Sequence, residues 1–137
     1  MRTPLRLAPP GLIALGLLAA CTDPRARPVP PVLTVQIAPT FRLTSPGTIA
    51  GSLYLFDEDG LFSLHLSVRS DDSTFVGDSL LALSGEPEIN RPITWNVPAG
   101  LSVGSGVRLA VTVKDYAGFA ATDTLHFAIQ TAAGGLR

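Results

Sequence analysis

The chain has 137 residues, with ten Lys and Arg against eleven Asp and Glu, a formal net charge of −1. This balance gives no basic surface of the extent that nucleic-acid binding requires, so we expect no nucleic-acid partner. Cys21 is the only cysteine, which excludes an intrachain disulfide and leaves an apolar core to stabilise the fold.

Residues 1–20 have the order of regions of a secretory signal. Arg2 and Arg6 precede an apolar run over residues 11–20 that ends in small side chains. This run is shorter than the ~20 apolar residues of a membrane-spanning helix, and Pro9-Pro10 interrupts any helix before it. We therefore predict a cleaved signal peptide and disfavour a permanent transmembrane anchor.

Leu18-Ala19-Ala20-Cys21 closes this segment and resembles the lipobox of bacterial lipoproteins. In that family the signal peptide is cut before the cysteine, here between Ala20 and Cys21. The thiol then takes a diacylglycerol, and the new amino group is usually acylated as well. The resemblance implies a mature chain of residues 21–137, bound to the membrane through two or three acyl chains on Cys21. An ordinary signal-peptidase site that leaves a free thiol is the alternative.

Residues 21–31 form the predicted tether. Four prolines among residues 22–31 favour extended polyproline II, a semi-rigid spacer of at most ~30 Å. Thr22 stands where enteric lipoproteins retained in the inner membrane carry Asp. This difference favours the outer membrane if the host has two membranes.

From residue 32 onward, apolar residues alternate with polar ones, the period of half-buried strands. The clearest segments are 33–37, 62–68, 107–113 and 125–129, and less regular ones are 49–56, 80–83 and 93–97. The side chains predicted to face the core include Phe62, Leu64, Leu66, Val68, Val107, Leu109, Val111 and Val113. Turn clusters of Gly, Pro, Asp and Ser separate the segments. We predict an all-β fold, a single seven-stranded antiparallel sandwich over residues 32–131 with a flexible tail at 132–137.

Residues 107–118, Val-Arg-Leu-Ala-Val-Thr-Val-Lys-Asp-Tyr-Ala-Gly, resemble the last hairpin of bacterial immunoglobulin-like and fibronectin type III-like domains. Residues 93–98, Ile-Thr-Trp-Asn-Val-Pro, resemble the strand before it. The resemblance covers residues 32–131 and implies an immunoglobulin-like sandwich that serves as a spacer, an adhesion module or a ligand-binding module. Two positions depart from the pattern: Phe119 replaces a common Asn, and Val107 replaces a common Tyr.

The turns at 57–60 and 115–118 should share one pole of such a sandwich. Asp57, Asp59 and Asp115 are then candidate ligands for Ca²⁺, which takes six to eight oxygens. We favour the interpretation that these residues only form turns, because EF-hand spacing is missing and Phe119 provides no oxygen. The carboxylates are therefore expected to stay solvated, and no metal or cofactor is predicted.

His65 and His126 fall on outward positions of strands that flank a common neighbour, with backbones ~9.5 Å apart. This separation disfavours a shared metal or catalytic site, so we predict solvated imidazoles and no enzyme activity. Trp95 is predicted to face the core, with an exposed sugar-stacking or peptide-stacking platform as the alternative. Tyr54 is the better candidate for an exposed aromatic side chain.

The sequence thus predicts an extracytoplasmic lipoprotein, anchored through Cys21, with a non-catalytic module for protein–protein assembly in the cell envelope. The alternatives are a Ca²⁺-dependent adhesion or carbohydrate-binding module and, with less support, a hydrolase or metal enzyme.

Overall fold

The computed structural model describes residues 29–133. The predicted signal peptide, Ala20, Cys21 and most of the tether lie outside this range. The predicted seven-stranded antiparallel sandwich is confirmed, and the described residues contain no helix. The strands are β1 (Val32–Ile37), β2 (Gly47–Phe56), β3 (Leu61–Ser70), β4 (Val76–Ala82), β5 (Glu88–Val97), β6 (Gly106–Asp115) and β7 (Ala120–Ala128). Residues 29–133 accordingly include no helix long and apolar enough to cross a membrane.

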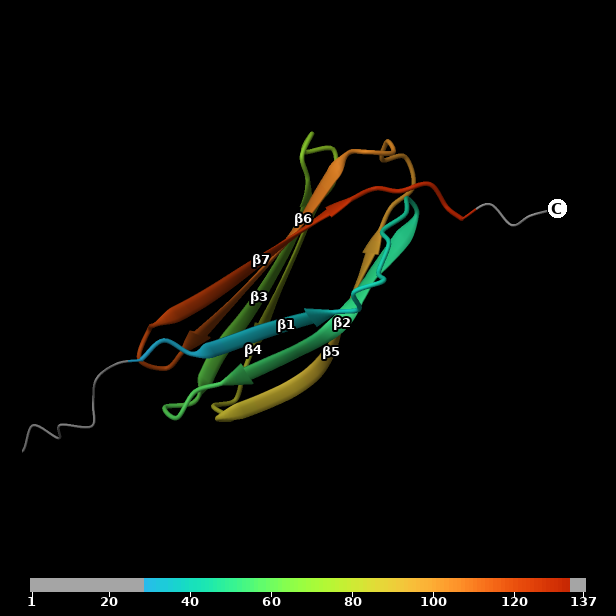
Figure 1. The fold of residues 1–137 in the computed structure, drawn as a ribbon. Helices are drawn as coiled ribbons and strands as arrows, with labels where there is room; N and C mark the ends of the chain where they lie inside the picture. The colour runs from blue at the N-terminus through green and yellow to red at the C-terminus, as the bar shows by residue number, and fades with distance from the viewer. Residues whose placement is uncertain (1–28, 134–137) are drawn as a thin grey trace, which may run out of the picture.

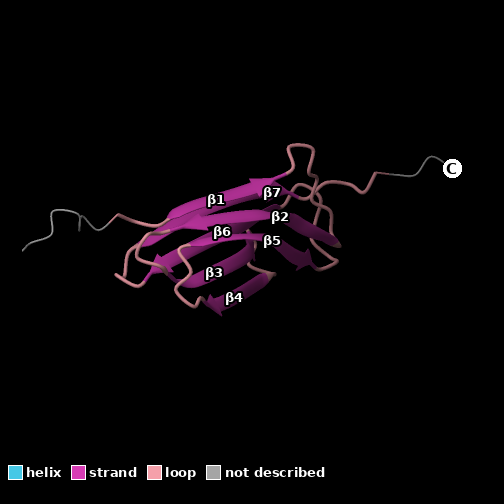
Figure 2. Ribbon diagram, turned by 90° about the horizontal axis from the view of Figure 1, so that it is seen from below, coloured by secondary structure: helices cyan, strands magenta, loops and turns pink. Residues whose placement is uncertain are grey.

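The strands form two stacked sheets (Figure 1). One sheet has the order β1-β2-β5 and the other has the order β4-β3-β6-β7, with every neighbouring pair antiparallel. The chain therefore passes from one sheet to the other after β2, after β4 and after β5. Figure 2 shows the two layers from below, with β4 at one margin of its sheet.

The core lies between the sheets and is made by the alternation that the sequence predicts. Val107, Leu109, Val111 and Val113 of β6 are each at most 1% exposed, and every second residue between them is more accessible. They pack with buried side chains of β2, β3 and β5 in one cluster. The remaining buried apolar members of that cluster are Leu43, Ile49, Leu53, Leu55, Leu61, Leu64, Leu66, Val68, Ile93, Val97 and Ile129. The predicted register of β6 is confirmed.

The prediction that Phe62 faces the core is wrong. The register of β3 against β6 shifts between Leu61 and Ser63, a β-bulge that lets Leu61 take the buried position. Leu61 is fully buried, while Phe62 is 49% exposed and packs edge-on against Tyr116 with ring centroids 5.2 Å apart. A bulge reverses the faces of the residues beyond it, so strict alternation fails at this one point.

Both β4 and β5 begin earlier than the apolar pattern indicates. β4 begins at Val76 and includes Gly77, and β5 begins at Glu88 and includes Pro92. Glycine and proline usually interrupt strands, but both of these lie on edge strands, where proline is tolerated. At Gly77 the Trp95 ring occupies the space that a Cβ would fill. The close approach of Trp95 therefore accounts for the glycine.

The two ends of the described chain lie at opposite poles of the sandwich (Figures 1 and 2). Val32 pairs with Phe56, so the chain enters β1 at the pole where β2 ends and β3 begins. We call this end the entry pole. The other end, where β3 ends and β6 begins, is the far pole.

The buried register makes a direct stability prediction. Val111→Asp should strongly destabilise the domain, because it buries an unpaired charge directly opposite the half-buried Asp123. Thr112→Asp should lower the free energy of unfolding by no more than ~1 kcal/mol, since Thr112 is partly accessible and loses only its hydroxyl contact with Thr122. Urea denaturation of both variants measures the difference. The reverse order of stabilities would mean that the faces of β6 are assigned incorrectly.

Candidate functional site

The acidic turn after β2 is held together by Asp57. Its Oδ1 accepts a hydrogen bond of 2.8 Å from the Asp59 backbone N–H, and its carbonyl accepts one of 3.2 Å from Gly60. Gly60 has a φ of +90°, a left-handed conformation that glycine adopts without strain. Asp57 is 6% exposed, whereas Asp59 is exposed. The Asp57 carboxylate is thus directed into its own turn.

Asp115 has the same role in the turn between β6 and β7. The Asp115 Oδ1 accepts a hydrogen bond of 2.8 Å from the Phe119 backbone N–H, and Asp115 is 2% exposed. Its Oδ2 is buried and has no hydrogen-bond partner among the described residues. The Tyr116 N–H donates to the Gly60 carbonyl at 3.2 Å, which joins the two acidic turns at the entry pole.

The expectation that these carboxylates stay solvated is wrong for Asp57 and Asp115, because both fold back over their own turns. Within residues 29–133 no three His, Cys, Asp or Glu side chains come close enough together to hold a metal ion. The structure therefore brings the two acidic turns together but does not assemble Asp57, Asp59 and Asp115 into one ligand set.

Asp72, in the turn between β3 and β4, repeats the arrangement in an exposed setting. Its Oδ1 accepts hydrogen bonds from the Ser70 hydroxyl at 2.7 Å and from the Thr74 N–H and hydroxyl at 3.0 and 2.7 Å. The pKa of Asp72 is lowered, first by the Ser70 hydroxyl and then by Thr74, because these donors favour the ionised carboxylate. Asp57, Asp72 and Asp115 thus each accept hydrogen bonds within their own turns.

The two histidines lie on the outward face of the four-stranded sheet, on strands that flank β6. His65 pairs with Thr112, whereas His126 pairs with Arg108, so they differ by four residues along the strands, or ~13 Å. The His65 Nε2 lies 3.1 Å from the Asp78 Oδ1. The structure does not bring the two imidazoles together.

The two predicted aromatic candidates occupy different faces. Trp95 pairs with the buried Ile49 and lies half-buried against the core, with its ring over Gly77. Tyr54 lies on the outward face of β2 and is half-buried. The pKa of Tyr54 is raised, first by its partial removal from water and then by the charge of the nearby Glu88. Neither forms an open stacking platform.

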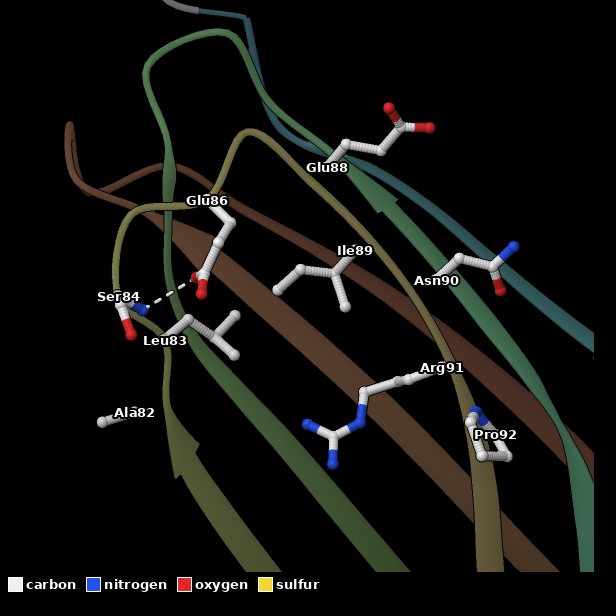
Figure 3. A pocket seen from close by; sticks show the side chains of 9 residues that line it. All are labelled: Ala82, Leu83, Ser84, Glu86, Glu88, Ile89, Asn90, Arg91 and Pro92. Carbon is white, nitrogen blue, oxygen red and sulfur yellow. Dashed lines mark hydrogen bonds between the residues drawn. The ribbon is translucent and has the colours of Figure 1, made fainter.

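A hollowed surface lies between the edge strands β4 and β5, and we call it the open seam (Figure 3). A cavity of about 580 Å³ lies near the entry pole and continues toward Trp95 as a smaller one of about 150 Å³. Arg91 and Pro92 line both. The side chains around the larger cavity are Ala82, Leu83, Ser84, Glu86, Glu88, Ile89, Asn90, Arg91 and Pro92.

Arg91 extends into the open seam. It pairs with the fully buried Leu53, which places it on the inward face of β5. Figure 3 shows its guanidinium directed from β5 into the cavity, with Ile89 and Leu83 nearby. Glu86 turns back to accept a hydrogen bond of 3.0 Å from the Ser84 N–H. The cavity thus combines the apolar side chains of Leu83 and Ile89, which we call its apolar floor, with the Arg91 guanidinium, and the carboxylates of Glu86 and Glu88 also line it.

The four edge strands, β1, β4, β5 and β7, differ in how accessible they are for pairing with an added strand. β1 and β7 contact each other, and a bridge between Leu43 and Ile129 continues this closure. β5 carries Pro92, which has no N–H to donate, and the inward charge of Arg91. β4 contains no proline, its one charged residue, Asp78, pairs with His65 of β3, and it exposes Leu80 at 73% and Val76 at 48%. Strand addition is therefore least obstructed at β4.

The backbone of β4 also presents donors toward the open seam. At one end of the pairing, the Leu83 N–H donates to the Phe62 carbonyl of the neighbouring strand, and at the other end the Phe75 carbonyl accepts from Ser70. Because successive backbone N–H groups of a strand point in opposite directions, those of the odd-numbered residues of β4 point at β3. The N–H groups of Asp78 and Leu80 consequently point away from β3, toward the free edge.

Sequence reasoning missed the open seam. The apolar pattern predicts that β5 begins at residue 93, which leaves Arg91 and Pro92 outside any strand, and that β4 begins at residue 80. The proline was the available signal, because a proline within a strand pattern indicates an edge.

The chain matches no protein-family model and no curated protein. Among solved structures it is similar to the sporulation control protein Spo0M from Bacillus subtilis, with a TM-score of 0.52 and 10% sequence identity. The match covers 76% of this chain and 51% of that one, so this chain spans about half the length of Spo0M. At this identity the similarity shows the all-β sandwich fold and nothing about activity.

The acidic turns give a prediction about calcium. A working site would stabilise the fold by ~2.7 kcal/mol at 100 times its dissociation constant, or about 10 °C in melting temperature. We expect no shift, because Asp57 Oδ1 and Asp115 Oδ1 already accept turn hydrogen bonds. Thermal unfolding with calcium and with magnesium as control measures this. A calcium-specific shift that disappears in Asp57→Asn with Asp115→Asn would establish an adhesion-type site.

Proposed function

We propose that the chain is a lipid-anchored extracytoplasmic lipoprotein whose immunoglobulin-like sandwich is a non-catalytic binding module in the cell envelope. Its partner is a protein that adds an extended segment to the free edge of β4. The binding proposal rests on this edge. The N–H groups of Asp78 and Leu80 point away from β3, and the Leu80 side chain is exposed.

The anchor rests on residues 18–21. Leu18-Ala19-Ala20-Cys21 follows an apolar run of signal-peptide length, and residues 22–31 contain four prolines. An extended tether of this length reaches at most ~30 Å. It would join the sandwich at the entry pole, so that β4 remains accessible along the side of the module.

The binding mode follows from the edges. A peptide that pairs with β4 satisfies the donors of Asp78 and Leu80, and it places alternate side chains in the open seam. The apolar floor at Leu83 and Ile89 suits an aliphatic side chain, and Arg91 suits an acidic one. We therefore expect a partner segment with alternating apolar residues and at least one carboxylate.

The anchor is tested by Cys21→Ser. The variant should leave the detergent-extracted membrane fraction and accumulate as a soluble or unprocessed form, because it lacks the acylated thiol. Membrane fractionation and intact-mass measurement check this, with Thr22→Ser as the matched control that keeps lipidation. Recovery of the Cys21→Ser variant in membranes at the mass of the natural protein would refute the anchor.

The binding edge is tested by photo-crosslinking in whole envelopes. A photoreactive amino acid replaces either Leu80 or Thr122, which lie at opposite margins of the same sheet. We expect a discrete protein adduct from position 80 and none from position 122. The same adduct, captured from position 76, should be lost in Leu80→Pro, which removes an edge N–H but no pairing with β3.

Equal adducts from positions 80 and 122, or an adduct that Leu80→Pro leaves unchanged, would contradict binding at β4. An adduct of twice the mass of the chain would instead mean pairing with a second copy. Leu81→Pro is the folding control, because the Leu81 N–H points at β3 and its loss should destabilise the domain.

A further inference from the structure

Three basic side chains lie in one row across the outward face of the four-stranded sheet, near the far pole. Arg69 pairs with Arg108, and Arg108 pairs with His126, so β3, β6 and β7 each contribute one. All three are exposed. They line a hollow of about 340 Å³.

The next row supplies the rest of the hollow. Ser67 pairs with Ala110, and Ala110 pairs with Thr124, so two hydroxyl groups flank one methyl group. All three residues line the hollow. The small Ala110 leaves space at the centre of the row, while the hydroxyls on either side can donate hydrogen bonds.

The arginine pair is unfavourable unless something neutralises it. Residues directly opposite in antiparallel strands have Cβ atoms ~4.5–5.5 Å apart, and like charges in this arrangement destabilise a sheet. Within residues 29–133 the one ion pair joins His65 to Asp78, and neither guanidinium contacts a carboxylate. The nearest acidic residue along the chain, Asp71, lies one row closer to the far pole on the same face, with its carboxylate over Gly106, and it makes no ion pair with either guanidinium.

The charge of the surroundings limits what can bind. Residues 29–133 contain five Lys and Arg against ten Asp and Glu. Two of these five, Arg69 and Arg108, lie side by side in this row. A long polyanion would be repelled by the rest of the surface, whereas a small anion contacts only the hollow.

We propose that Arg69, Arg108 and His126, with the hydroxyls of Ser67 and Thr124, form a binding site for a single phosphate group. Guanidinium groups donate paired hydrogen bonds that match tetrahedral oxyanions. The hydroxyls and the imidazole N–H provide further donors to the remaining oxygens. The site is separate from the open seam and does not depend on the proposed anchor.

A titration of inorganic phosphate tests this site. Backbone and Arg side-chain NMR signals of the isotope-labelled full chain with Cys21→Ser are followed at constant ionic strength, with chloride as the reference anion. We expect saturable shifts at residues 67–69, 108–110 and 124–126. Arg69→Gln with Arg108→Gln should weaken phosphate binding at least about tenfold, whereas Arg42→Gln, an exposed arginine outside the hollow, should not.

Vesicles separate the two sources of phosphate. The same Cys21→Ser chain, which has no acylation site, is mixed with vesicles of phosphatidylglycerol or of phosphatidylcholine alone. The site is assigned to a lipid headgroup if the chain binds phosphatidylglycerol vesicles but not inorganic phosphate, and if the double variant no longer binds these vesicles. Binding of inorganic phosphate alone assigns it to a soluble phosphate compound.

Stability gives an independent readout. Because the arginines repel each other, Arg108→Gln should raise the melting temperature without phosphate and abolish the further rise that phosphate produces in the natural sequence. The proposal is overturned if neither phosphate nor anionic vesicles bind. It is also overturned if the double variant binds both as well as the natural chain does.

Discussion

The burial of β6 between β3 and β7 is the constraint on which the rest of the structure depends. Val107, Leu109, Val111 and Val113 fill the inner face of this strand, so a shift of one residue would move all four into water. That fixed register also determines what the outer face presents. Arg108 lies between Arg69 and His126 on the outer face, and Ala110 lies between Ser67 and Thr124. Both positions are fixed because the adjacent apolar residues of β6 are buried in the core.

The two sides of the sandwich are closed differently, and the proposed partner site at β4 rests on this difference. On one side β1 contacts β7, and the bridge between Leu43 and Ile129 extends the contact. On the other side the cavities of the open seam lie between β4 and β5, and the Trp95 ring of β5 lies over Gly77 of β4. The inward guanidinium of Arg91 keeps that gap polar at its centre. A soluble sandwich usually protects each edge by proline, by charge or by covering it, and β4 has the least such protection.

The alternation of residues along single strands could be predicted from the sequence, but contacts between distant strands could not. Leu109 and Val111 sit in an uninterrupted apolar pattern, so their faces were predictable from local spacing. Phe62 was assigned to the wrong face because a bulge leaves no local mark in the sequence. Arg69 and Arg108 are 39 positions apart, so their pairing follows only from the register of β3 and β6. The acidic turns were located correctly, but the burial of Asp57 and Asp115 depends on how their side chains fold back.

Amide hydrogen exchange along β4 in the full chain tests most directly whether this edge is open for the proposed strand addition. We expect slow exchange at Gly77, Ser79 and Leu81, whose N–H groups point at β3, and fast exchange at Asp78 and Leu80. The fast amides should become protected in envelopes that contain the partner. Equal protection along residues 76–82 in the isolated chain would mean that the edge is already paired and would contradict an open β4 edge.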